Sequence, residues 1–165
     1  MKNRLVTSAK QGGITLIEVM IAIAIIAIVA AIAVPAYQSQ IARQNLVLVS
    51  ENLISDIKFA RSEALKRSDE VEFAITSGAN WSYVISDNAS NEIKSVSSSN
   101  YSGISGLTLT NLASGAFSFD GVRGLSNVPG NATITFNASG DSASVVVNVV
   151  GRAWICDLSG YEDCP

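Results

Sequence analysis

The chain has 165 residues, with 11 Lys and Arg against 14 Asp and Glu and no His. The lack of His removes the commonest general base and metal ligand, and no Gly-rich phosphate loop or spaced pair of carboxylates replaces it. The acidic balance also argues against the clustered cations with which nucleic-acid-binding proteins neutralise phosphates. We therefore predict a protein without catalytic residues, cofactor or bound metal.

The N-terminal segment 1–13 is basic and ends in two glycines. Its charges are Lys2, Arg4 and Lys10, and without them 8 Lys and Arg face 14 Asp and Glu, a side-chain charge of −6. A secretory signal peptide has its small-residue cleavage site after the apolar region, whereas here the small residues precede it. Cleavage at the glycines would leave the apolar segment on the mature protein as its new N-terminus.

An apolar run from Ile14 to Val34 follows, and Glu18 is its only charge. At about 1.5 Å per residue, a helix of this length reaches across a hydrocarbon core of about 30 Å, so we predict one membrane crossing. The preceding cations place the N-terminal end in the cytoplasm and everything after Pro35 on the far side. A carboxylate in such a segment costs about 2.5–3.5 kcal/mol at the bilayer centre, so Glu18 needs a functional reason.

The basic segment, Gly13, the string ITLIE that follows it and Pro35 together resemble the class III leader of type IV pilins and pseudopilins. The resemblance implies that prepilin peptidase cuts between Gly13 and Ile14 and N-methylates Ile14. It also implies a buried assembly acid at Glu18 and a helix kink at Pro35. The family usually has Phe at the position of Ile14. The alternatives are an ordinary membrane anchor with a chance Glu and an anchored periplasmic binding module, neither of which would be processed.

The position of Glu18 suggests an electrostatic role in assembly. If the N-terminal helices pack in a dry filament core, an unpaired charge there is strongly penalised. Cleavage would create a cationic amine at Ile14, and Glu18 of a neighbouring subunit could pair with it. We hypothesise that this pair sets the axial register of the subunits.

A second helical pattern covers residues 36–67. Its apolar positions recur at steps of three or four, with one longer step between Ile41 and Leu46, and form a stripe that a sheet could cover. Glu63 can pair with Arg67 one turn later. The stripe comprises Tyr37, Ile41, Leu46, Val49, Leu53, Ile57, Ala60 and Ala64.

Beyond residue 68 the pattern alternates as strands do. A hairpin is predicted around 71–75 and 81–85, with further strands around 107–109, 117–119, 134–136 and 145–149. Gly140 and Asp141 supply a turn before the last of these. The stretch 86–106 is rich in Ser, Asn and Gly and is predicted to be an exposed loop.

These patterns predict an α+β fold in which one long N-terminal helix packs on an antiparallel sheet head. We divide the chain into a leader at 1–13, a membrane or filament-core helix at 14–35, an amphipathic helix at 36–67 and a β-rich head at 68–165.

Two cysteines, Cys156 and Cys164, close a short C-terminal segment. A disulfide is the favoured state in an oxidising periplasm. A zinc site would need two further ligands, which Asp157, Glu162 or Asp163 would have to supply, so it is the weaker alternative.

Three further strings lie at the end of the second helix and in the head: Ala60–Arg67, Phe136–Gly140 and Gly151-Arg152 before Cys156. With them, the chain resembles more narrowly the GspH/FimT/FimU group of minor pilins and pseudopilins. Some members of the FimT branch take part in DNA uptake through a Gly-Arg-x-Arg string, whose second Arg is absent here. Arg152 and Trp154 would be the DNA contacts, and this is the weaker hypothesis because the head is acidic.

The favoured interpretation is that the chain is a minor pilin, which is incorporated into a type IV pilus and primes or caps the filament. It would lie in the bacterial inner membrane with its head in the periplasm and then enter the filament. Its partners would be prepilin peptidase, the membrane and other major and minor pilins. The rivals are a type II secretion pseudopilin and a DNA-binding tip subunit.

Overall fold

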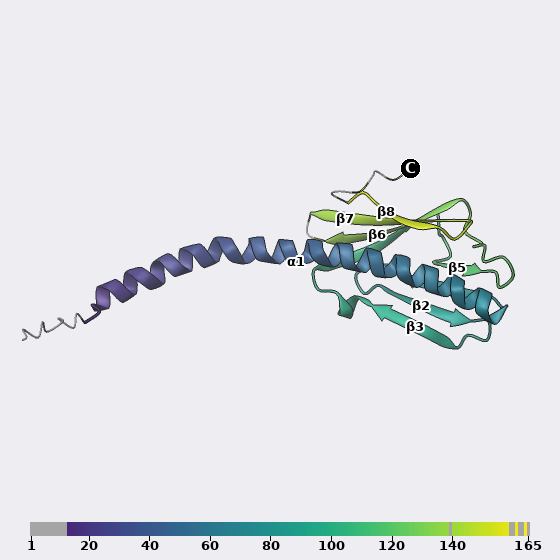
Figure 1. Ribbon diagram of the computed structural model, residues 1–165. Coiled ribbons are helices and arrows are strands. Elements are labelled where there is room, and N and C mark those ends of the chain that lie inside the picture. Colours follow the sequence, from purple (N-terminus) through teal and green to yellow (C-terminus); the bar gives the residue numbers. More distant parts are fainter. Residues whose placement is uncertain (1–12, 139, 159–160, 162–163, 165) are drawn as a thin grey trace, which may run out of the picture. The chain divides into compact units, whose positions relative to one another are not determined.

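The computed structural model describes residues 13–138, 140–158, 161 and 164. The chain divides into two compact units, Met1–Tyr37 and Gln38–Pro165. Helix α1, Leu16–Arg67, runs through both units. The second unit contains the rest of the secondary structure that the model describes (Figure 1).

In the first unit, all the described residues of α1 are exposed. Every residue from Gly13 to Gln40 is exposed, although nearly all of those before Pro35 are apolar. By length and composition, α1 is the one described helix that could cross a membrane. An apolar surface of this extent needs lipid or other protein around it.

In the second unit, α1 is buried along one side, as the stripe predicts. Its buried apolar positions are Ala42, Leu46, Val49, Leu53, Ile57, Ala60 and Ala64. The stripe starts later than predicted, because Tyr37 is 68% exposed and Ile41 is only half-buried. Ala42 is the first buried position, since the backbone at Gly103 lies directly against it.

The described strands form two antiparallel sheets of four strands, where the sequence suggested one. The first has the order β3-β2-β1-β5 and the second β4-β6-β7-β8. The bounds of the first are β1 Val71–Thr76, β2 Ser82–Asp87, β3 Glu92–Ser97 and β5 Ala116–Phe119. The bounds of the second are β4 Ile104–Thr110, β6 Asn131–Ala138, β7 Asp141–Asn148 and β8 Ala153–Cys156.

The predicted hairpins are confirmed. Strand β1 pairs with β2 so that Phe73 lies opposite Ile85, and β6 pairs with β7. Gly140 precedes β7 with φ +89°, a conformation that a residue with a Cβ adopts at a cost.

The prediction that 86–106 is an exposed loop is wrong in part. Strand β3 and the short 3-10 helix Ser98–Asn100 lie within it, and β4 begins at Ile104. Strand β3 is an edge strand whose apolar side chains are only Ile93 and Val96, so its sequence lacks the alternation of a half-buried strand. Strand β3 forms because it pairs with β2, and the local sequence pattern does not encode such a tertiary contact.

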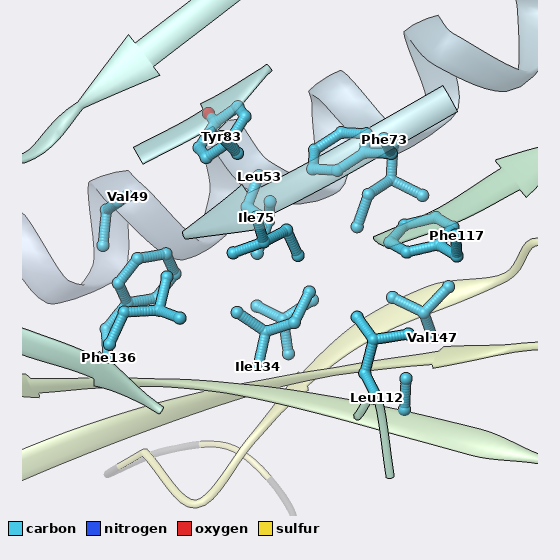
Figure 2. Close-up of a cluster of buried hydrophobic side chains, with 14 of the residues drawn as sticks. Val49, Leu53, Phe73, Ile75, Tyr83, Leu112, Phe117, Ile134, Phe136 and Val147 are labelled. Atoms are coloured by element: carbon cyan, nitrogen blue, oxygen red, sulfur yellow. The ribbon is translucent and has the colours of Figure 1, made fainter. Parts of the chain in front are cut away.

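Side chains from α1 and from both sheets meet in one core (Figure 2). Figure 2 shows Val49 and Leu53 of α1 in this core together with Phe73 and Tyr83 of the first sheet and Phe136 of the second. The ring of Phe73 stacks on those of Tyr83 and Phe117, with centroids 5.2 Å apart in each pair. The core therefore fixes both sheets to the same helix.

A polar group also lies in this core. Asp56 of α1 is buried and accepts hydrogen bonds from the Tyr83 hydroxyl at 2.9 Å and from Lys94 Nζ at 2.6 Å. Burial, and then the charge of Asp56, raise the pKa of Tyr83 far above its usual value, so Tyr83 stays protonated and donates. The contact ties the edge strand β3 to the helix.

The end of α1 carries the predicted ion pair. Arg67 Nε lies 3.0 Å from Glu63 Oε2, and Lys66 Nζ lies 3.2 Å from Glu63 Oε1. Arg67 also reaches Asp87 on β2, with Nη1 3.6 Å from Oδ2. The hydrogen bonds from Arg67 and Lys66 lower the pKa of Glu63, and those from Asn91 lower the pKa of Asp87.

We expect these carboxylates to make the head sensitive to acid. A carboxyl group whose pKa is lowered by folding stabilises the native state above its unfolded pKa, and that contribution is lost as pH falls through the folded pKa. The free energy of unfolding should therefore fall from about pH 4 downward. Urea titrations of the full chain in detergent between pH 3 and pH 7 would measure it, and Glu63→Gln should show a shallower fall. An equal fall in both proteins would contradict the assignment to Glu63.

Candidate functional site

The first described residues build the start of α1. Thr15 precedes the helix, and its Oγ1 accepts a hydrogen bond from the Glu18 backbone N–H at 3.3 Å. The Thr15 carbonyl accepts from the same N–H at 3.1 Å. Thr15 thus caps the helix and Glu18 stands in its first turn, where the helix dipole favours a negative charge.

The predicted cleavage position lies outside the helix. Gly13 and Ile14 have no regular structure, and Ile14 is 77% exposed. A peptidase needs an extended, accessible backbone, and Gly13 also offers no side chain to obstruct it. The residues before Gly13 lie outside the described part of the chain, and the predicted leader with them.

Glu18 has no ion-pair partner among the described residues of its own chain. The next charged residue in the sequence is Arg43, far along the same helix. A cation that neutralises Glu18 in apolar surroundings would therefore come from outside the described residues, such as the leader, a new chain terminus or another molecule.

Pro35 lies inside α1, and the helix continues through it. A proline removes the backbone donor that would bond the carbonyl four residues earlier. A kink at Pro35 stays a prediction.

The predicted disulfide between Cys156 and Cys164 is present, with Cα atoms 5.1 Å apart. Cys156 belongs to β8 and is buried. The Cys156, Asp157 and Cys164 ligand atoms lie within 4.8 Å of one another, but a disulfide leaves no thiolate for a metal. The bond therefore joins the C-terminal segment to the second sheet.

We expect loss of this disulfide to lower the free energy of unfolding by about 2–3 kcal/mol, since it closes a short loop. Thermal melts of the full chain with and without dithiothreitol would measure this. The Cys156→Ala/Cys164→Ala variant is the control, because the reductant should leave its melt unchanged. An unchanged melt of the reduced natural chain would contradict the prediction.

The two predicted DNA contacts differ in exposure. Arg152 is exposed in the turn between β7 and β8, and its backbone N–H donates to Asn148 Oδ1 at 2.9 Å. Trp154 is half-buried on β8, opposite Val146. They lie on one strand edge of an acidic protein, which is a small basic footprint for a polyanion.

The described part of the head includes a cleft of about 410 Å³ beside the end of α1. Asp69, Glu70 and Asp120 line it together with Ser, Asn, Gly and Leu residues. The lining of the cleft is therefore mainly carboxylates, hydroxyls and an amide.

Two known family models match this chain, one at its N-terminal segment and one over most of the head. The prokaryotic N-terminal methylation motif matches residues 8–34, and the family described as type II transport protein GspH matches residues 49–151. The chain belongs to the GspH family. GspH-family proteins are type IV pilin-like structural subunits, and a methylation motif implies processing by prepilin peptidase.

Two crystal structures of the type IV minor pilin FimU from Pseudomonas aeruginosa resemble this GspH-family protein. The TM-scores are 0.55 and 0.52, each at 15% identity. The first match covers 68% of this chain and 89% of FimU, and the second 67% and 91%. This likeness confirms the pilin-like fold.

Two fimbrial proteins of Pseudomonas aeruginosa are each 45% identical to this GspH-family protein over 67 residues. The matched part is 40% of this chain and 42% of each relative, so the chain spans less than half the length of these relatives.

Sequence reasoning missed two features of the site region. Thr15 was part of the resemblance but not recognised as a helix cap, although Thr followed three residues later by Glu is a capping-box pattern. The polar contact of Asp56 with Tyr83 and Lys94 was also missed, and an acid next to Ile57 of the apolar stripe was its only local signal.

Proposed function

We propose that this GspH-family protein is a minor pilin of a type IV pilus, which helps to prime or cap the filament. It is cleaved between Gly13 and Ile14, N-methylated at Ile14, held in the inner membrane with its head in the periplasm, and drawn into a growing fibre. It acts as a subunit and catalyses no reaction.

One observation carries the proposal: an exposed apolar helix with a single charge, Glu18, directly follows an accessible Gly13–Ile14 bond. This geometry gives a peptidase its substrate and gives the new amine an acidic partner. The chain with Ile14 as its first residue would then carry a cation just before an apolar rod and an anion in the first turn of that rod. Pairing across subunits would satisfy both charges.

Mass spectrometry of the chain from its native membrane tests the proposal. A chain that begins at methylated Ile14 and is present in sheared filaments supports it. An intact Met1 start would overturn it in favour of an ordinary anchor. Immunogold labelling at filament tips would support the priming or capping role.

A type II secretion pseudopilin is the second candidate, because the matching family is described as a type II transport protein. The same rod and head serve either assembly. Deleting the gene distinguishes them: loss of surface pili supports the pilus, while loss of protein secretion with intact pili supports the pseudopilus.

A further inference from the structure

The cations that follow the leader divide into two groups. Ion pairs hold Arg43 with Asp141 at 3.8 Å, Lys66 and Arg67 with Glu63, and Lys94 with Asp56. The remaining 4 of the 8 are Lys58, Arg61, Arg123 and Arg152. They have no carboxylate within salt-bridge distance in the part of the chain that the structure describes.

Three of these cations converge where α1 ends. A Cβ placed on Gly124 would lie 3.0 Å from Arg61 Nε, and one placed on Gly151 would lie 3.2 Å from Arg61 Cδ and 3.4 Å from the Gly124 carbonyl oxygen. The turns that carry Arg123 and Arg152 therefore pack on the stem of Arg61. Arg123 and Arg152 each stand next to one of these glycines and are exposed.

Both turns are held by backbone hydrogen bonds. The Gly124 N–H donates to the Asp120 carbonyl, and the Gly151 N–H donates to the Asn148 carbonyl, each at 2.9 Å. Arg61 Nε is buried between the turns without a hydrogen-bond partner in the described structure. A guanidinium with a fixed stem loses less conformational entropy on binding than a free one.

Exposed apolar side chains lie in the two turns that carry Arg123 and Arg152. Val122 is 79% exposed, Val150 52% and Val149 43%. Single exposed apolar residues are ordinary, but here three lie in the same two turns as the cations. We call Arg61, Arg123, Arg152, Val122, Val149 and Val150 the arginine-valine surface.

We propose that the arginine-valine surface is a docking site for the face of another pilin subunit that carries carboxylates among aliphatic side chains. Charge complementarity selects such a partner, because these cations are unpaired on a chain whose side-chain charge without the leader cations is −6. The valines favour a protein over a nucleic acid, since a phosphate backbone would leave them without apolar contact. This inference rests on the proposed function.

Photo-crosslinking tests it in cells that make the filament. A photoreactive amino acid replaces Val122 in the full chain, and antibodies against each of the other pilin subunits identify the product. We expect a crosslink to one of them, which Arg123→Glu or Arg152→Glu should lower about tenfold because like charges then meet at the contact.

Two controls match these variants. Arg43→Glu makes the same charge change at a solvent-exposed ion pair, which contributes little, and should preserve the crosslink. The photoreactive residue at Ser99, which is exposed in the 3-10 helix, should give no such product. Thermal melts check that each variant is folded.

Several results would overturn the docking site. These are a mature, filament-incorporated chain without the crosslink, a crosslink only to a second copy of this chain, and a crosslink that both glutamate variants preserve. Retardation of a 20-base-pair DNA duplex at physiological salt that Arg152→Glu abolishes would reassign the surface to nucleic acid. A chain that is unprocessed or absent from filaments would instead refute the proposed function.

Discussion

Glu18→Gln subunits are expected to be cleaved and to accumulate in the membrane, but to fall about a hundredfold or more in sheared filaments. The reason is the cost of a broken charge pair in dry surroundings, about 3–5 kcal/mol when one partner of a buried pair is removed. In the variant, the amine of Ile14 would be buried opposite a neutral amide. Quantitative immunoblots of membranes and filaments from the same cells would measure the ratio.

The choice of Gln separates the charge of Glu18 from its place in the helix. Gln can serve in a capping box as Glu does, so the start of α1 at Thr15 should be preserved. Thr15→Val is the matched control, because it removes the cap hydrogen bond at 3.3 Å but leaves the acid, and it should reduce incorporation much less. Normal incorporation of Glu18→Gln would refute the pairing hypothesis.

The elements with strong local patterns were predicted from sequence. The stripe Leu46, Val49, Leu53 and Ile57 has helical spacing, and all four side chains are buried. Strands β1, β2 and β6 alternate clearly, β7 is buried from Ala143 to Val147, and the four strands form the predicted hairpins. In each case, local preference and tertiary contacts agree, so the pattern is enough.

Two edge strands, β3 and β8, were not predicted, because their partners form them. Strand β3 places Lys94 at a core-facing position opposite Ile85, where an alternating pattern would have an apolar residue. Strand β8 is four residues long, and the turn before it does not contain a residue pair that is typical of hairpin turns. The division into two sheets follows from these pairings and from the packing of α1 against both, which a single sequence does not encode locally.

The candidate sites also differ in how close together their residues lie in the sequence. Gly13, Ile14 and Glu18 lie in one contiguous motif, so sequence alone suggested their roles. The arginine-valine surface joins α1 to two distant turns, and Arg61, Arg123 and Arg152 lie far apart in the sequence. Only the close approach of Gly124 and Gly151 to Arg61 brings them together.

Asp56→Ala is expected to lower the free energy of unfolding of the head by about 2–4 kcal/mol. Asp56 is buried and accepts from Tyr83 at 2.9 Å and from Lys94 at 2.6 Å. Its loss leaves the buried Tyr83 hydroxyl without its acceptor and frees Lys94 from the core. Chemical denaturation of the full chain in detergent would measure the change.

The variants Lys94→Met and Tyr83→Phe measure how much each of the two contacts of Asp56 contributes to the free energy of unfolding. Lys94 is 45% exposed at its side chain, so its charge remains partly solvated and Lys94→Met should cost less than Asp56→Ala. Tyr83→Phe removes the buried donor itself and leaves Asp56 with Lys94, so it should also cost less. Asp56→Ala should therefore lower the free energy of unfolding more than Tyr83→Phe does. An equal loss in the two variants would show that the contact of Lys94 with Asp56 does not stabilise the packing of β3 on α1.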